Sequence, residues 1–125
     1  MARVLVVDDE PMYRENLQEV IAEEGHDVQV ADNGHKAIEI AGRFCPDVLI
    51  VDWMLRNDIC GLEVSKFLRE SNPHLITIII TGYPTQDLRT QAEEAKVFAF
   101  LEKPFELGDI RDAVRKATQV GTGKE

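Results

Sequence analysis

Acidic side chains follow two hydrophobic runs of this 125-residue chain. Asp8 and Asp9 come after the run at residues 3–7, and Asp52 comes after the run at residues 47–51. Three carboxylates packed together repel one another, and a divalent cation relieves that repulsion. Mg²⁺ takes oxygen ligands, commonly one or two carboxylates beside phosphate oxygens. The three residues therefore predict a Mg²⁺ site in which one Asp can act as the nucleophile toward a phosphoryl donor.

Two later hydrophobic runs also end in polar groups. Residues 76–80 lead into Thr81 and Gly82, and residues 98–101 lead into Glu102 and Lys103. Lys103 could supply a positive charge to phosphoryl oxygens, Thr81 a hydroxyl donor, and Gly82 a backbone N–H that no side chain obstructs. Each residue taken singly has an ordinary structural explanation, such as a solvated turn or a local backbone contact. Their shared position at the ends of the runs is what indicates a site.

The elements that must position these groups are predicted by hydrophobic period. The runs are nearly continuous, which is typical of parallel strands buried on both faces. Between and after them, apolar residues recur at helical spacing and predict helices. The helical stripes are Tyr13, Leu17, Val20 and Ile21; Ala37, Ile40, Ala41 and Phe44; Val64, Phe67 and Leu68; Leu88, Ala92 and Ala95; and Leu107, Ile110, Val114 and Ala117.

This alternation predicts the fold class. Five strands alternating with five helices require right-handed crossovers and one parallel sheet. We predict an α/β, doubly wound, five-stranded parallel sheet with strand order 2-1-3-4-5. In that order the topological switch point lies between strands 1 and 3, so Asp8, Asp9 and Asp52 flank one crevice at the carboxyl edge of the sheet.

Turn residues agree with this division of the chain. Pro11 and Pro84 are expected in the first turns of two helices, where a missing N–H costs nothing, and Gly25 is expected just after the first helix. We predict one domain over residues 1–119 and a short polar tail over residues 120–125.

Composition excludes several classes of partner. The formal charge of −9, from 23 acidic and 14 basic residues, argues against nucleic-acid binding by this domain alone. No apolar run approaches the ~20 residues that span a bilayer, and the first strand begins too early to leave room for a signal peptide. Cys45 and Cys60 have no metal-binding spacing and fit reduced thiols in a cytoplasmic protein.

Four segments together resemble the receiver domain of two-component response regulators. They are residues 4–10 (VLVVDDE), 48–52 (VLIVD), 78–82 (IIITG) and 100–105 (FLEKPF), and the resemblance extends over roughly residues 3–118. It implies the flavodoxin-like receiver fold, with Asp52 as the phosphoacceptor. It also implies that Asp9 binds Mg²⁺ directly, that Asp8 assists, and that the main-chain carbonyl of Met54 completes the protein ligands.

The resemblance further implies a switch. Thr81 and Lys103 would contact the phosphoryl oxygens, the Lys103–Pro104 bond would be cis, and Thr81 and Phe100 would move on phosphorylation. The phosphoryl group would come from a histidine kinase, a phosphotransfer protein or a small phosphodonor. The output surface would be the fourth helix, fifth strand and fifth helix, roughly residues 84–117. It would act on an output domain or another protein, with a homodimer left open. From the residues alone, without the resemblance, core packing is the favoured interpretation of Phe100.

The chain departs from the family pattern at two points. After Asp52, Arg56 stands where the family usually has proline, and Gly61 lies nine residues on, one more than is usual. Before strand 5, Lys96 stands where glycine is frequent, and a positive φ there would strain it. A degenerate receiver that binds partners without phosphorylation is therefore the alternative function.

Bulky side chains at Met54 and Tyr83 predict slow self-dephosphorylation.

Other functional classes fit less well. An aspartyl-phosphate hydrolase of the haloacid dehalogenase type needs Asp-x-Asp after the first strand, and Glu10 stands where the second Asp should be. The glycine-rich loops of Rossmann and P-loop nucleotide sites are absent from the sequence. We therefore predict a phosphoacceptor that catalyses its own phosphorylation, not an enzyme with a turnover substrate.

Overall fold

The computed structural model describes residues 1–55 and 58–122, with the backbone alone for 120–122. Strands and helices alternate along the described chain. In order, the elements are β1 (Arg3–Val7), α1 (Pro11–Glu23), β2 (Asp27–Ala31), α2 (Gly34–Phe44), β3 (Val48–Asp52), α3 (Gly61–Ser71), β4 (Ile76–Thr81), α4 (Gln86–Glu94), β5 (Ala99–Glu102) and α5 (Leu107–Thr122). The strands form one parallel sheet in the order β2-β1-β3-β4-β5, which confirms the predicted fold class.

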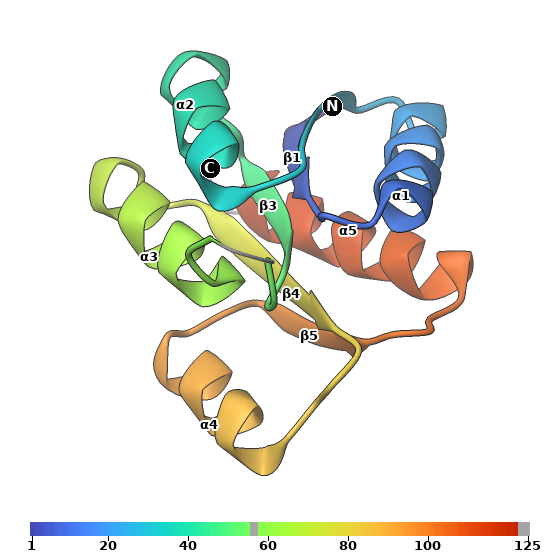
Figure 1. Ribbon diagram of the computed structural model, residues 1–125. Coiled ribbons are helices and arrows are strands. Elements are labelled where there is room, and N and C mark those ends of the chain that lie inside the picture. Colours follow the sequence, from blue (N-terminus) through green and yellow to red (C-terminus); the bar gives the residue numbers. More distant parts are fainter. Residues whose placement is uncertain (56–57, 123–125) are drawn as a thin grey trace.

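The sheet is covered on both faces (Figure 1). Helices α1 and α5 pack on one face, and α2, α3 and α4 lie on the other. Alternate residues of one strand face opposite layers. In β1, for example, Leu5 and Val7 belong to the core beneath α2 and α3, while Val4 and Val6 belong to the core beneath α1 and α5.

Burial separates the central strands from the edge strands. Strands β1, β3 and β4 are almost fully buried, as their continuous apolar runs predict. Strand β2 instead alternates exposed and partly buried residues, and no residue of β5 is fully buried. The edge strands therefore do not follow the two-sided burial that the sequence predicts for every strand.

The sequence predicts the boundaries of helix α1 correctly and the start of helix α4 wrongly. Pro11 is the first residue of α1, and Gly25, at φ 92°, follows its end. The expectation that Pro84 lies in the first turn of α4 is wrong. The N-cap of α4 is Thr85, whose hydroxyl accepts a hydrogen bond from the Leu88 N–H, so the helix begins only after the proline.

Two predicted stripe residues face solvent. Phe67 of α3 is 51% exposed and Leu107 of α5 is 40% exposed, so both are corrections to the predicted inward faces. Helix α5 continues to Thr122, past the expected domain boundary at residue 119. Among the described residues, no helix is both long and apolar enough to span a membrane.

The turn before β5 requires a positive φ, and the residue there is a lysine, for which that conformation is unfavourable. Lys96 adopts φ 60°, where a side chain crowds the backbone. Cys45, the C-cap residue of α2, adopts φ 53°. Neither position is occupied by glycine, so the fold holds two L-residues in the left-handed region.

Candidate functional site

The polar residues predicted to form a site lie together at the carboxyl edge of the sheet. Asp8 follows β1 directly, Asp52 is the last residue of β3, and Thr81 is the last residue of β4. Lys103 follows β5, and its bond to Pro104 is cis, as the resemblance implied. Parallel strands end at the same edge, so residues far apart in sequence converge there.

Four carboxylates form the centre of the site. One oxygen from each of Asp8, Asp9, Glu10 and Asp52 lies within 4.8 Å of the others. Asp8 and Asp52 are buried, with 0% and 4% exposure, whereas Asp9 and Glu10 are partly exposed. The cluster therefore has a buried floor and an open rim, where a ligand could enter.

Lys103 places its ammonium among these carboxylates. Nζ donates to Asp52 Oδ2 at 2.8 Å and to Glu10 Oε1 at 3.1 Å, and it lies 3.0 Å from Asp8 Oδ2. Lys103 is only 8% exposed. A buried ammonium needs such partners, because burial otherwise disfavours its charge.

The charges of these groups depend on one another. Burial raises the pKa of Asp8 to about 6 despite the opposing hydrogen bond from the Glu10 N–H and the nearby Lys103 ammonium. Burial likewise raises the pKa of Asp52, against the effect of Lys103. Burial alone would lower the pKa of Lys103, but its interactions with the Asp52 and Asp8 carboxylates dominate and hold the pKa above its usual range. The cluster carries more negative charge than one ammonium balances.

The donor set fits Mg²⁺. Hard carboxylate oxygens are the ligands that this ion prefers. Asp8 Oδ2 is buried and has no hydrogen-bond partner among the described residues, although the ammonium lies 3.0 Å away. A buried carboxylate oxygen with no hydrogen bond is one that a cation could satisfy. Asp8, Asp9 and Asp52 are the residues that would hold the ion.

Asp52 is held on both of its oxygens. Oδ1 accepts a hydrogen bond from the Met54 N–H at 3.0 Å, and Oδ2 accepts the one from Lys103. The Met54 side chain is 55% exposed. The predicted role of the Met54 carbonyl as a metal ligand stays a prediction.

Thr81 and Gly82 line the same edge. Thr81 is buried, its Oγ1 accepts a hydrogen bond from the Tyr83 N–H, and its carbonyl accepts one from the Lys103 N–H. At Gly82 an added Cβ would meet only Lys103 Cβ, at 4.0 Å. The approach to the Gly82 backbone is therefore open, and both assigned roles stay predictions.

The loop after Asp52 returns closely onto the strand. The Gly61 N–H donates to the Trp53 carbonyl, and a Cβ on Gly61 would lie 2.2 Å from the Asp52 carbonyl oxygen. Asp58 holds the loop to α2, since its carboxylate accepts from the His35 and Ile59 N–H groups and pairs with the His35 ring. Arg56, where the departure from proline was noted, lies outside the described residues.

Phe100 of β5 is partly buried against the core and lies beside α4. The guanidinium carbon of Arg89 lies 4.8 Å from its ring centroid, and Arg89 also approaches Glu102 at 3.8 Å. The ring therefore contacts both the core and a charged side chain of α4. Whether it moves stays a prediction.

Sequence reasoning missed two residues of the site. Glu10 was named within the segment at residues 4–10 and as a departure from Asp-x-Asp but given no role, and Tyr13 was assigned only to a helical stripe. In the structure Glu10 binds Lys103, and the Lys103 ammonium lies 4.1 Å from the Tyr13 ring centroid. Their place in the first turn after Asp8 and Asp9 was the available signal.

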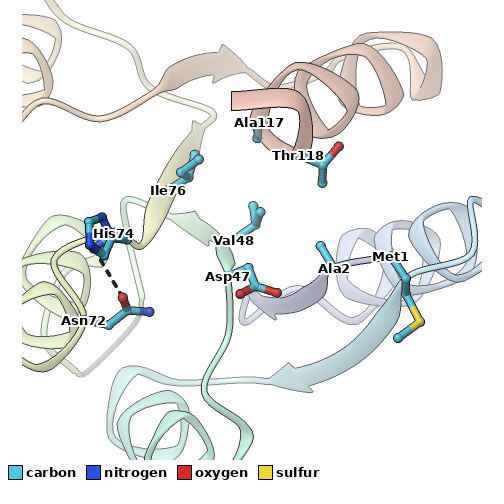
Figure 2. Close-up of a pocket in the computed structure, with 9 residues that line it drawn as sticks. All are labelled: Met1, Ala2, Asp47, Val48, Asn72, His74, Ile76, Ala117 and Thr118. Carbon is cyan, nitrogen blue, oxygen red and sulfur yellow. Dashed lines mark hydrogen bonds between the residues drawn. The ribbon is translucent and has the colours of Figure 1, made fainter. Parts of the chain in front are cut away.

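A cavity of about 260 Å³ opens at the opposite edge of the sheet (Figure 2). Its lining includes Val48 and Ile76, and two of its polar side chains have local partners. Asn72 binds the Pro46 carbonyl and the His74 N–H, and Asp47 accepts from the Arg3 N–H. The carboxylate cluster thus lies at the other edge from this cavity.

Comparisons with known proteins agree on one family. A sequence model described as the response regulator receiver domain matches residues 4–115. Sporulation initiation phosphotransferase F of Bacillus subtilis is 32% identical over 91% of this chain and 91% of its own length. Response regulator MprA of Mycobacterium leprae is 32% identical over 90% of this chain but 49% of its own length. The chain thus spans about half of that longer relative.

Solved structures agree with the fold. A response regulator receiver domain protein from Clostridium thermocellum superposes with a TM-score of 0.91 at 25% identity, with all of both chains covered. A CheY-like receiver domain protein from Methanospirillum hungatei gives a TM-score of 0.93 at 18% identity, over 100% of this chain and 99% of that one. At such low identity the second likeness concerns the fold alone.

Proposed function

Because the chain belongs to the family of response regulator receiver domains, we propose that it is a phosphorylation switch whose acceptor is Asp52. The observation that carries the proposal is the convergence of Asp8, Asp9, Asp52 and Lys103 within one acidic cluster. Mg²⁺, when bound, would neutralise charge on the carboxylates and on the transferring phosphoryl group.

In the proposed reaction, a carboxylate oxygen of Asp52 attacks the phosphorus of the donor. The new O–P bond forms as the bond to the donor's nitrogen or oxygen breaks, and the product is an aspartyl phosphate. Lys103 transfers its hydrogen bond from Asp52 Oδ2 to a phosphoryl oxygen, and the Thr81 hydroxyl donates a hydrogen bond to another. The Gly82 N–H, on a residue where an added Cβ would meet only Lys103 Cβ at 4.0 Å, is the proposed backbone donor to the same group. Hydrolysis later returns the carboxylate and inorganic phosphate.

The partners follow from this role. The donor is a histidine kinase or a phosphotransfer protein in the cytoplasm, and the output acts through α4, β5 and α5. Movement of Thr81 and Phe100 would connect Asp52 to that surface. We assign no nucleic-acid binding to this domain, since its charge is −9.

Mass spectrometry of the intact protein tests the proposal. The chain is incubated with acetyl phosphate, with and without Mg²⁺, beside Asp52→Asn. One phosphoryl group that requires Mg²⁺ and is absent from the variant supports the switch. The fluorescence of Trp53, the single tryptophan, should report Mg²⁺ binding independently because it follows Asp52 and is 7% exposed.

The alternative is a degenerate receiver that binds partners without phosphorylation. It predicts no added mass from acetyl phosphate or from kinases of the same organism, and unchanged signalling in a strain that carries Asp52→Asn. Loss of signalling in that strain would exclude it.

The phosphorylated state should be long-lived. Met54 and Tyr83 are 55% and 75% exposed beside the site, and neither side chain positions a water for attack. We expect a half-life of many minutes without a phosphatase. Met54→Asn should shorten it several-fold, because an amide can orient water, whereas Met54→Leu should not. A half-life of seconds in the unmodified protein would contradict this expectation.

A further inference from the structure

Tyr13 and Glu10 form a second set of contacts for the Lys103 ammonium. Both residues lie at the start of α1, Glu10 as the N-cap position and Tyr13 in the first turn. Glu10 Oε1 accepts a hydrogen bond from Nζ at 3.1 Å, and the Tyr13 ring centroid lies 4.1 Å from the same atom. These contacts are separate from those to Asp8 and Asp52, the buried carboxylates of the predicted metal site.

The Tyr13 ring is itself held in place. Its centroid lies 5.7 Å from that of Phe105, with the two ring planes inclined by 49°. Phe105 in turn packs against the core beneath α1 and α5. The ring therefore contacts both the partly buried Phe105 ring and the Lys103 ammonium. An ammonium over a tyrosine face is attracted by the ring quadrupole, and more strongly where water is excluded.

A divalent cation and the Lys103 ammonium would compete for the same carboxylate oxygens. A divalent cation at Asp8 and Asp52 would take the oxygens that now bind the ammonium, and it would repel the ammonium as well. During phosphoryl transfer, however, Lys103 must stay beside Asp52. Contacts that do not involve the metal ligands could keep it there.

We propose that Tyr13, assisted by Glu10, is a positioning residue that retains Lys103 beside Asp52 when the carboxylates bind a divalent cation. This inference rests on the proposed function, because it concerns the same transfer to Asp52. Tyr13 acts through Lys103 and touches no reacting atom. The aromatic face of Tyr13 attracts the ammonium, and its hydroxyl takes no part.

Substitution at Tyr13 tests the proposal. Tyr13→Phe keeps the ring and should phosphorylate within about twofold of the unmodified rate with acetyl phosphate and saturating Mg²⁺. Tyr13→Leu and Tyr13→Met keep apolar volume without a ring, and both should be slower by about five- to tenfold. Glu10→Gln keeps an acceptor oxygen without the charge and should be slower by about two- to threefold. Met12→Leu, a neighbouring change at a 64% exposed position, is the control.

A spectroscopic measurement on the protein with and without saturating Mg²⁺ separates positioning from mere stability. In spectra of the ¹⁵N-labelled lysine ammonium, the Lys103 protons should be shifted upfield by the ring current of Tyr13. The shift should persist in Tyr13→Phe and disappear in Tyr13→Leu and Tyr13→Met. This readout does not require phosphorylation, so it stands even if Asp52 accepts no phosphoryl group.

The outcomes are distinguishable. Equal rates for Tyr13→Phe, Tyr13→Leu and Tyr13→Met at saturating Mg²⁺ would overturn the proposal, as would a Lys103 signal unaffected by loss of the ring. No phosphorylation of the unmodified chain, together with a ring-dependent Lys103 signal, would overturn the proposed function and leave only the contact. A graded rate that follows the ring would support both.

Discussion

At the scale of single residues, the site contains a conflict that its own lysine only partly resolves. Asp8 is fully buried, and one of its oxygens has no hydrogen-bond partner among the described residues. Burial raises its pKa from 3.8 to about 6, so at neutral pH the fold holds an ionised carboxylate at a cost. The site is therefore suited to bind a cation at the expense of the stability of the metal-free protein, because a divalent cation supplies the positive charge that the cluster lacks.

Because the pKa of Asp8 is raised in the folded state, ionisation of Asp8 lowers the stability of the fold as pH rises. The folded state binds the Asp8 proton more tightly than the unfolded chain, so this stabilisation is complete below about pH 4 and is lost as pH rises through about 6. Asp8→Asn should therefore stabilise the metal-free protein at pH 7.5 by about 1–3 kcal/mol. The gain should vanish near pH 4. Thermal melting of both proteins from pH 4 to 8 measures the difference.

Addition of Mg²⁺ provides the control for this prediction. Mg²⁺ should raise the melting temperature of the unmodified protein at pH 7.5, since a ligand that binds only the folded state stabilises it. The increase should be smaller for Asp8→Asn. A difference in melting temperature between the two proteins that stayed constant from pH 4 to 8 would show that ionisation of Asp8 does not lower the stability of the fold.

At the scale of elements, strand ends were predictable and the surroundings of helix starts were not. Asp52 and Thr81 were placed correctly because an apolar run that stops at a polar residue marks the end of a buried strand. Tyr13 was assigned to the core because its spacing fits a helical stripe. Periodicity gives the face of a helix, however, and cannot say that its first turn lies against a lysine that follows strand β5.

The same limit explains the smaller errors. Proline is common both in first helical turns and in the loops before them, and at α4 the hydroxyl cap of Thr85 decides the boundary. Phe67 fits a stripe by spacing but lies at its border, where it is exposed. The position of Glu10 directly after Asp9 was its one signal, and it does not reveal a contact with Lys103, 93 positions further along the chain.

The loop between β3 and α3 yields a prediction at this scale. Gly61→Ala would place a Cβ 2.2 Å from the Asp52 carbonyl oxygen, a distance that forces the backbone to move. We expect a loss of about 2 kcal/mol or more in the free energy of unfolding, together with slower phosphorylation, because the displaced residue carries the acceptor. Urea unfolding and the acetyl phosphate reaction measure the two effects.

Gly42→Ala is the matched control for the glycine substitution. Gly42 lies within α2, and an added Cβ there meets nothing within 4 Å. Alanine should stabilise this helix by about 0.5–1 kcal/mol and leave phosphorylation unchanged. If Gly61→Ala proved as stable as Gly42→Ala, the close return of the loop onto β3 would be wrong.

At the scale of the whole molecule, the site and the proposed output surface are joined through β4 and β5. Thr81 pairs in register with Glu102, and Phe100 lies two residues earlier in β5, against α4. Arg89 of α4 contacts both Phe100 and Glu102. A change at Thr81 therefore has a short route to α4 through paired strands and side-chain contacts.

The contact between Arg89 and Phe100 gives the last prediction. If phosphorylation moves Phe100, the cation–π contact with Arg89 favours the unphosphorylated arrangement by about 0.5–1 kcal/mol, since Arg89 is exposed. Arg89→Met keeps an apolar stem but removes the charge, and it should shift the Phe100 ring resonances of the unphosphorylated protein toward their phosphorylated positions. Arg43→Met, which removes an exposed i,i+4 pair with Glu39 on α2, should not. Phosphorylation that moves the Phe100 resonances while Arg89→Met leaves them unchanged would show that Arg89 plays no part in the switch.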